Sequence, residues 1–424
     1  MGVLVNLLAT IMLRSVSGAA MAGVGLLGII NFLLMTSFTA IASGVTAVVS
    51  QHVGAGEVKT AGATSSHSIV LTVYISAGLG LLMTALSWPI LHGLFPGAEA
   101  DVLEAANIYL IYSSVSLPFL ALFSAIAGVM RAAGNTRLPM IGALVSNVIF
   151  TAVAAVCIYH LGLGVHGSGL GLAVSRLATA ALLAWWLYRG KGGIYLTRLT
   201  IKPDMQILRP VLKIAVPAGI DSMIFNLGKL LLNVFLAGMG TPVLEANAIV
   251  NNLANFTILP GGTMGIVSVI LVGQAWGAGD TKKAKRLSLA TTGVGSLMQM
   301  AACILFLLLP SHGITWFNPG AEAFHAARAA LLVNLIATPF FWSASFGLPQ
   351  ALRATGDAKF TMYVSIISMV FMRVLLAWVL GVYLDLRLMG IWLAMVTDWV
   401  VRSAFFVTRA LRMHKRHNPW EAAE

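Results

Sequence analysis

The chain has 424 residues, of which 58% are hydrophobic and only 9% are charged, whereas a soluble globular domain carries about 25% charged residues. This composition excludes an ordinary soluble enzyme and favours a polytopic, all-α membrane protein, because about 20 apolar residues suffice for one spanning helix. The formal net charge of +12 fits the Lys and Arg excess of cytoplasmic loops better than it fits nucleic-acid binding.

Apolar segments between polar or Gly/Pro-rich breaks predict twelve spanning helices. The first six lie at residues 1–13, 22–53, 66–95, 102–130, 138–160 and 166–188, and the last six at 211–239, 244–276, 287–311, 325–352, 360–384 and 389–408. The organisation expected from this pattern is an N-terminal six-helix lobe at 1–190, a basic linker at 191–210, a C-terminal six-helix lobe at 211–412 and a tail at 413–424.

Basic residues set the expected orientation of these spans. Most of the 26 Lys and Arg residues fall in the loops that follow even-numbered spans, in the linker and in the C-terminal tail. Because cytoplasmic loops are rich in Lys and Arg, both termini are predicted to be cytoplasmic. We therefore expect a multi-pass protein of the cytoplasmic (inner) membrane.

The two halves of the chain repeat each other. The segment that starts at Gln51 reads QHVGAGEVKTA and recurs at Gln274 as QAWGAGDTKKA, and the segment RAAGNT at Arg131 recurs at Arg353 as RATGDA. A third block, PGAEA, occurs at 96–100 and again at 319–323. Parallel six-helix repeats are an architecture of secondary transporters, with the substrate site between the halves. A duplication that only enlarges a helical bundle is the alternative.

The repeated blocks are expected to form tight connections. Glycines in Gln-x-x-Gly-Ala-Gly permit positive φ or a close approach of two backbones, and Arg-Ala-x-Gly-Asn/Asp is expected to form a second cytoplasmic turn. These blocks are interpreted either as helix caps beside the membrane or as a cytoplasmic gate. The residues concerned are Gln51, Gly54, Gly56, Arg131, Gly134, Gln274, Gly277, Gly279, Arg353 and Gly356.

These paired blocks, with the ending at 390–395 and 398–403, make nearly the whole chain resemble multidrug and toxic compound extrusion (MATE) transporters. The resemblance implies twelve helices in two six-helix lobes, a V-shaped cavity, and extrusion of organic, often cationic, compounds in exchange for H+ or Na+. We expect small organic cations and other amphipathic toxic compounds as substrates, membrane lipid around a monomer, and no nucleic acid. No cofactor, metal or enzymatic activity is expected.

Asp221 is the strongest candidate for binding the coupling ion or the substrate. A charge inside the hydrocarbon layer costs several kcal/mol unless it is paired or faces a polar cavity, so such residues are functional candidates. A carboxylate in a partly dry cavity can exchange a proton in each transport cycle, and when ionised it can ligate Na+ or a cationic compound. Asn226, Asn251 and Asn255 are expected to supply neutral oxygens nearby. A static ion pair with Lys229 or with a neighbouring helix is the alternative.

Asp398 is the second acid inside a predicted span. Its spacing predicts an i,i+4 ion pair with Arg402. Arg373, in the preceding span, is an alternative partner, and direct coupling at Asp398 is an alternative role.

Arg176 takes nearly the position of Asp398 in the first repeat, so the two lobes are expected to differ in function. Its alternative role is to bind backbone carbonyls or a phosphate near the helix end. Compared with family members that couple protons through the N-terminal lobe, the first and fifth spans lack acids. Asn147 and Thr151 remain there as polar lining of the cavity, together with Arg176, and Arg373 is expected to line the cavity in the other lobe.

Two further expectations concern the start of the chain and rival functions. The first span has about 13 residues, which is too short to cross a membrane, so we expect a truncated first helix or a misplaced start codon. A flippase or exporter of lipid-linked or polyprenyl intermediates remains an alternative function, and it should show extra spans or a basic cavity. A channel or a membrane enzyme is a further alternative.

Overall fold

The computed structural model describes residues 16–191, 193, 202–308 and 310–413, together with Val5, Leu8, Ala9, Met12 and Leu13. Most of the predicted span at 1–13, and all of the predicted tail at 413–424 except Met413, therefore lie outside the described residues. The same holds for the middle of the predicted linker.

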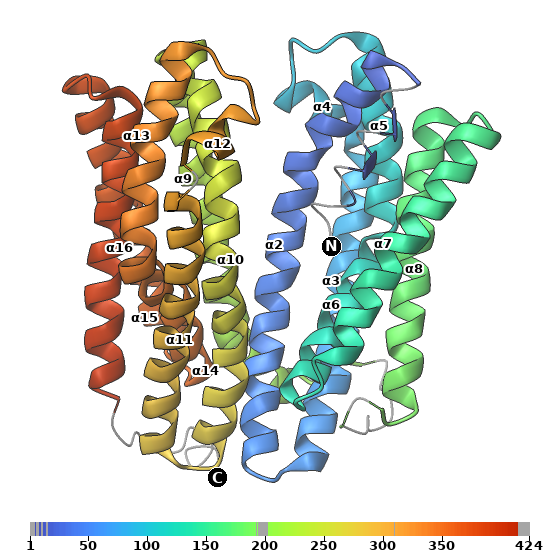
Figure 1. Cartoon of the computed structure of the whole chain (residues 1–424). Helices are drawn as coiled ribbons and strands as arrows, with labels where there is room; N and C mark the ends of the chain where they lie inside the picture. The colour runs from blue at the N-terminus through green and yellow to red at the C-terminus, as the bar shows by residue number, and fades with distance from the viewer. Residues whose placement is uncertain are drawn as a thin grey trace. The chain divides into compact units, whose positions relative to one another are not determined.

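Helices follow one another along the whole described chain (Figure 1). The first half contains α2 (Gly18–Gly54), α3 (Val58–Ala85), α4 (Ser87–Leu94), α5 (Ala100–Val115), α6 (Leu117–Ala132), α7 (Arg137–Ala155), the π-helical turn η1 (Val156–His160) and α8 (Gly164–Tyr188). The second half contains α9 (Met205–Gly238), α10 (Thr241–Gly277), α11 (Thr281–Leu308), α12 (Pro310–Thr315), α13 (Ala321–Ala337), η2 (Thr338–Gly347), α14 (Leu348–Ala354), α15 (Ala358–Ser368), η3 (Met369–Leu375), η4 (Trp378–Tyr383) and α16 (Arg387–Leu411).

The described helices make this a multi-pass membrane protein. Ten of them are long and apolar enough to cross a membrane, or eleven when the bent pair α5 and α6 counts as one span. That pair bends by 46°, and Pro118 in the first turn of α6 explains the break, since proline removes a backbone donor and clashes with the preceding turn. Each predicted span from 22–53 onward overlaps at least one helix.

The chain divides into two compact units. Unit 1 comprises Met1–Val49 and Glu57–Ala215, and unit 2 comprises Ser50–Gly56 and Val216–Glu424. Two details differ from the sequence-based division. Helix α9 begins at Met205, inside the stretch predicted to be linker, because a spanning helix can continue past the hydrocarbon layer into a basic segment. The last turn of α2 belongs to unit 2 rather than to unit 1.

In unit 1, α3 packs against α5 and α6, and α7 packs along α8 (Figure 1). Small residues let these helices approach closely, as is typical of membrane bundles. A Cβ on Gly171 in α8, for example, would lie 2.9 Å from the Cβ of Ala154 in α7. The apolar interior includes fully buried Tyr109 and Phe150.

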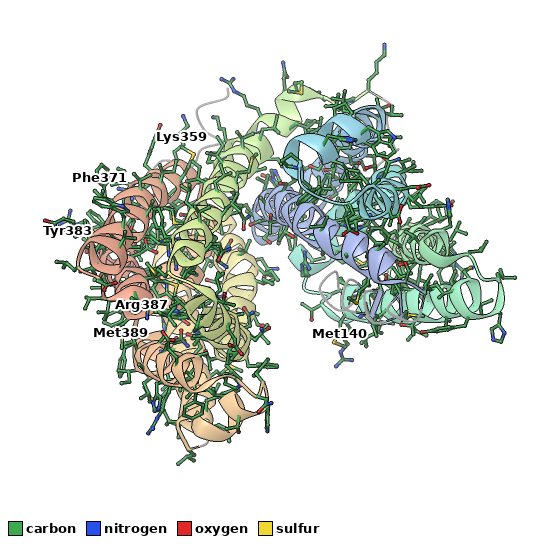
Figure 2. The ribbon with its side chains drawn as sticks, turned by 90° about the horizontal axis from the view of Figure 1, so that it is seen from above. Met140, Lys359, Phe371, Tyr383, Arg387 and Met389 are labelled. Atoms are coloured by element: carbon green, nitrogen blue, oxygen red, sulfur yellow. The ribbon has the colours of Figure 1, made fainter. Side chains whose placement is uncertain are left out.

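In unit 2, α10 packs along α11 and α13, and α16 packs against the π-helical segments η2, η3 and η4. Its apolar interior contains Leu236, Leu331 and Trp392. Large apolar side chains also cover the outside, where Phe371 and Tyr383 are 53% and 73% exposed and point away from the helices (Figure 2). An apolar exterior of this kind is what contact with lipid requires.

Candidate functional site

Asp221 lies in α9 and is ion-paired with Arg353, in the last turn of α14. The pair is buried, since the Asp221 side chain is 12% exposed and the Arg353 side chain 8% exposed. Arg353 Nε also donates to Thr361 Oγ1 on α15 at 3.2 Å. The carboxylate is therefore bound by a cation from a neighbouring helix, as one of the two sequence-based alternatives foresaw, and that cation is not Lys229.

The predicted turns are present, and Arg131 and Arg353 are their first residues, since the backbone N–H of Gly134 donates to Arg131 O at 2.9 Å and that of Gly356 donates to Arg353 O at 3.0 Å. Both Arg131 and Arg353 are the basic residues in the last turns of their helices, α6 and α14. The positive-φ residues of these turns are Gly134, with φ 87°, and Gly356, with φ 88°. Because the arginine precedes the positive-φ glycine by three residues, its backbone is still helical. Its side chain is therefore free to point into the bundle.

Asp398 in α16 is fully buried and has two partners. Ser368 Oγ donates to Asp398 Oδ1 at 2.5 Å, and Arg373 Nε in η3 lies 3.7 Å from Oδ2. Of the two partners that the sequence offered for Asp398, the structure has Arg373, and no ion pair of Asp398 with Arg402 is found among the described residues. The guanidinium of Arg402 lies 4.4 Å from the ring centroid of Phe346 in η2. It therefore makes a cation–π interaction with this ring.

A cavity of about 180 Å³ lies among α9, α10, η3 and α16 of unit 2. Lys229, Arg373 and Asn251 line it, whereas Asp221 and Asp398 do not. Asn251 Nδ2 donates to the backbone oxygen of Asn247 at 2.8 Å. Arg373 thus lines a cavity within unit 2, while its predicted place in a cavity between the halves stays a prediction.

The other two asparagines of the predicted site lie outside this cavity. Asn226 Nδ2 donates to the backbone oxygen of Ser222 on its own helix at 2.9 Å. Asn255 is exposed on α10. The predicted set of asparagines is therefore divided between different surroundings.

Arg176 in α8 is buried in unit 1 and binds α5 and the residue that follows it. Its Nη1 donates to the backbone oxygen of Ser113 at 3.0 Å and to Ser116 Oγ at 2.8 Å. This confirms the alternative in which it binds a backbone carbonyl. Asn147 and Thr151 are half-buried on α7, where Thr151 Oγ1 donates to the Asn147 backbone oxygen at 2.8 Å.

Acids are distributed unevenly between the described parts of the two units. Among the described residues, the buried acids are Asp221 and Asp398, both in unit 2. Within the same part of the chain, no group of three or more His, Cys, Asp or Glu side chains is placed to hold a metal ion. The buried carboxylates of the described residues therefore all lie in unit 2.

The paired Gln-x-x-Gly-Ala-Gly blocks approach each other within unit 2. A Cβ on Gly54 would lie 1.9 Å from the backbone oxygen of Gln274, and a Cβ on Gly277 would lie 1.9 Å from that of Gln51. Gln51 Nε2 also donates to the Ala354 backbone oxygen at 2.6 Å. The predicted close approach of two backbones is confirmed, and the sequence did not indicate that the two copies supply it to each other.

The following glycines of the two blocks have positive φ, as predicted. Gly56 has φ 78° and Gly279 has φ 76°. Asp280 Oδ1 accepts the backbone N–H of Lys283 at 2.8 Å, which caps the start of α11. These contacts fit the cap interpretation, while the gate interpretation remains a prediction.

An exposed ion pair gives a contrast to the buried ones. Arg387 Nη1 lies 2.8 Å from Glu322 Oε1, with side chains 48% and 59% exposed. Exposed pairs contribute about 0–1 kcal/mol, so Glu322→Gln is expected to lower the apparent melting temperature in detergent by less than about 2 °C. A thermal shift as large as that of an Asp221 variant would contradict this ranking of the pairs.

Comparison with known proteins decides the family. The family model described as MatE matches residues 2–156 and 217–379. The chain belongs to the MatE family. A transporter fold with multiple spanning helices follows from this membership, and no enzyme is found among the relatives described below.

Relatives of this MatE protein are named as transporters or multidrug export proteins. A probable multidrug resistance protein NorM of Thermotoga maritima is 25% identical over 404 residues, covering 93% of this chain and 85% of the relative. An uncharacterized transporter YisQ of Bacillus subtilis is 26% identical over 415 residues, covering 94% and 88%. The multidrug export protein MepA of Staphylococcus aureus is 24% identical over 292 residues, covering 68% and 64%.

Solved structures share the fold of the MatE chain. A crystal structure of MATE in the bent conformation has a TM-score of 0.89 at 19% identity and covers 97% of this chain and 91% of its own. A transporter of the MOP superfamily from Pyrococcus furiosus, described as having a binding pocket of reverse polarity, has a TM-score of 0.85 at 19% identity, covering 98% and 93%.

Proposed function

We propose that this MatE protein is a cation-coupled antiporter that extrudes organic, amphipathic toxic compounds, organic cations included, across the cytoplasmic membrane. The observation that carries the proposal is the buried Asp221–Arg353 pair inside spanning segments of a MATE-family chain. The names of the relatives support drug export as the activity. In this proposal the protein acts as a monomer with both termini cytoplasmic.

The coupling step proposed is a competition for the Asp221 carboxylate. In the described state Arg353 occupies it. A proton that neutralises the carboxylate, or a Na+ that ligates it, releases the Arg353 guanidinium. Breaking a buried pair costs about 3–5 kcal/mol, and inverting a two-state population from 1:99 to 99:1 takes about 5.5 kcal/mol. One ion bound at Asp221 is thus enough to shift the conformational equilibrium substantially.

Other predicted residues have supporting roles in the proposed transport cycle. Asp398, which accepts a hydrogen bond from Ser368 and lies beside Arg373, is a second position for the coupling ion. Asn226 and Asn255 supply polar groups along α9 and α10. The blocks at Gln51 and Gln274 close the cytoplasmic end of the transport path.

The alternative functions are less well supported. The named relatives are multidrug resistance and export proteins, and their names do not favour a flippase for lipid-linked intermediates. A membrane enzyme or a channel is not favoured by membership of a transporter family.

Ethidium efflux from proteoliposomes tests the proposal. The purified protein is reconstituted, and efflux is followed under an imposed H+ gradient, an imposed Na+ gradient, and neither. We expect one of the two gradients to accelerate efflux at least several-fold, because bound ion and bound substrate exclude each other. Equal efflux in all three conditions, or efflux no faster than in protein-free liposomes, would contradict the proposal.

A further inference from the structure

The cavity in unit 2 has an unusual set of polar groups. Two cations, Lys229 and Arg373, line it, and no carboxylate is among its lining residues. Both cations also flank one ring, since Lys229 Nζ lies 5.3 Å and Arg373 Cζ 4.9 Å from the ring centroid of Phe225. Their charges are therefore at most about 10 Å apart, a separation one small ligand can bridge.

Hydrogen-bond donors at this cavity lack acceptors. Arg373 Nε and Nη1 are buried without a hydrogen-bond partner, and so is Trp392 Nε1. Both side chains are 2% exposed and both line the cavity. An unsatisfied buried donor costs about 1–3 kcal/mol, and more when it is charged. The cavity therefore offers donors that an acceptor-bearing ligand would satisfy.

The neighbouring acids offset only part of the positive charge at the cavity, through the contact of Asp398 with Arg373. Asp221 is engaged by Arg353, and Asp398 accepts a hydrogen bond from Ser368. Asp398 lies 3.7 Å from Arg373 Nε without forming a hydrogen bond to it. A guanidinium has five N–H donors, so Arg373 retains capacity for a second anion. Lys229, exposed at the cavity wall, adds a further positive charge.

We infer that this cavity binds the anionic group of the transported compound, a carboxylate or a phosphate attached to an apolar or aromatic body. Lys229 and Arg373 supply the charge, and Trp392 Nε1–H supplies a neutral donor. The rest of the wall is mostly aliphatic, with Leu232 and Met395 among its residues, which suits the apolar body. This inference rests on the proposed export function and adds organic anions and zwitterions to the organic cations among its substrates.

Equilibrium binding to the purified, detergent-solubilised protein tests the inference independently of transport. Two probes with the same ring and opposite charge are compared, 2-naphthoate and 2-naphthylmethylammonium. We expect the naphthoate to bind more tightly and to raise the melting temperature of the protein, since a ligand that binds only the folded state stabilises it. Lys229→Gln should weaken naphthoate binding about tenfold or more, while Lys229→Arg should retain most of it.

Lys359→Gln is the matched control, because Lys359 is exposed and points away from the helices of unit 2 (Figure 2). It should leave naphthoate binding unchanged. Lys229→Gln is expected to fold normally, since it removes a charge that has no ion pair among the described residues. Its melting temperature without ligand checks this. Naphthoate binding that is absent, or that is equal in wild type and Lys229→Gln, would overturn the inference.

Two added measurements distinguish a lipid phosphate from other anions as the ligand, and distinguish the anion site from the proposed antiport function. Competition by short-chain phosphatidic acid that is lost in Lys229→Gln would support the anion site and identify a lipid phosphate as its occupant. Gradient-driven ethidium efflux without naphthoate binding would overturn the inference and leave the proposed function standing. Naphthoate binding without gradient-driven efflux of ethidium or of naphthoate would support the anion site and contradict the antiport proposal.

Discussion

Replacing Asp221 by asparagine is expected to abolish drug resistance in cells and to lower the stability of the protein by about 3–5 kcal/mol. The substitution removes the only ion-pair partner found for Arg353 among the described residues and leaves a buried guanidinium without a counter-charge. Resistance to ethidium, measured at matched expression level, and the apparent melting temperature in detergent check the two effects. Wild-type resistance in Asp221→Asn cells would contradict the coupling role.

A double variant separates coupling from folding. In Asp221→Asn/Arg353→Gln both buried charges are removed, and exchanging a whole buried pair for neutral groups is often close to neutral in stability. We expect its melting temperature to return close to the wild-type value while resistance stays absent. Recovery of resistance together with stability would show that the pair only holds α9 and α14 together.

Adding a methyl group at Gly54 or Gly277 is expected to prevent normal folding. Each glycine packs against the backbone of the opposite block, with a Cβ that would come within 1.9 Å of the oxygen of Gln274 or Gln51. Backbone cannot move aside as a flexible side chain can, so we expect Gly54→Ala and Gly277→Ala to cost about 3 kcal/mol or more. Membrane-inserted protein that elutes as a monodisperse peak in detergent is the quantity to measure.

Gly78→Ala in α3 is the control for these two variants. A Cβ at Gly78 meets nothing within 4 Å, and alanine is favoured over glycine in a helix by up to about 1 kcal/mol. This variant should express and elute as the wild type does. Normal yield of Gly54→Ala and Gly277→Ala would show that the two blocks separate at little cost.

Hydrophobic patterning was sufficient to place the spans from residue 22 onward, because lipid requires long apolar helices and these stand out in the sequence. The duplicated blocks were equally informative. Gly134 and Gly356, at matching repeat positions, have φ of 87° and 88°, so the same residue pattern produces the same backbone. Local chemistry of this kind depends on neighbours in the chain and can be predicted from them.

Partners of the buried charges could not be predicted in the same way. Spacing indicates only neighbours on one helix, and it favoured Arg402 as the partner of Asp398. The observed cation, Arg373, comes from another helix, and Arg402 contacts the ring of Phe346 instead. Arg353 was missed as the partner of Asp221 because its motif indicates a turn. The available signal was that the arginine precedes the turn glycine by three residues.

The end of α2 likewise has contacts that sequence spacing could not predict, because it belongs to the second unit. Its helical pattern runs without interruption, yet Ser50–Gly56 belongs to the second unit. The matching Gln-x-x-Gly-Ala-Gly blocks could have suggested this pairing, since two copies of a close-approach motif fit against each other. Sequence spacing alone does not distinguish that arrangement from two separate caps.

The most direct test of the central claim is uphill transport by the double variant Asp221→Asn/Arg353→Gln in proteoliposomes. With the effective ion gradient imposed, wild-type protein should move ethidium against its concentration gradient. The double variant should only equilibrate it, because the coupling ion has lost its carboxylate. Uphill movement of ethidium by the double variant at the wild-type rate would contradict the claim that an ion at Asp221 couples transport.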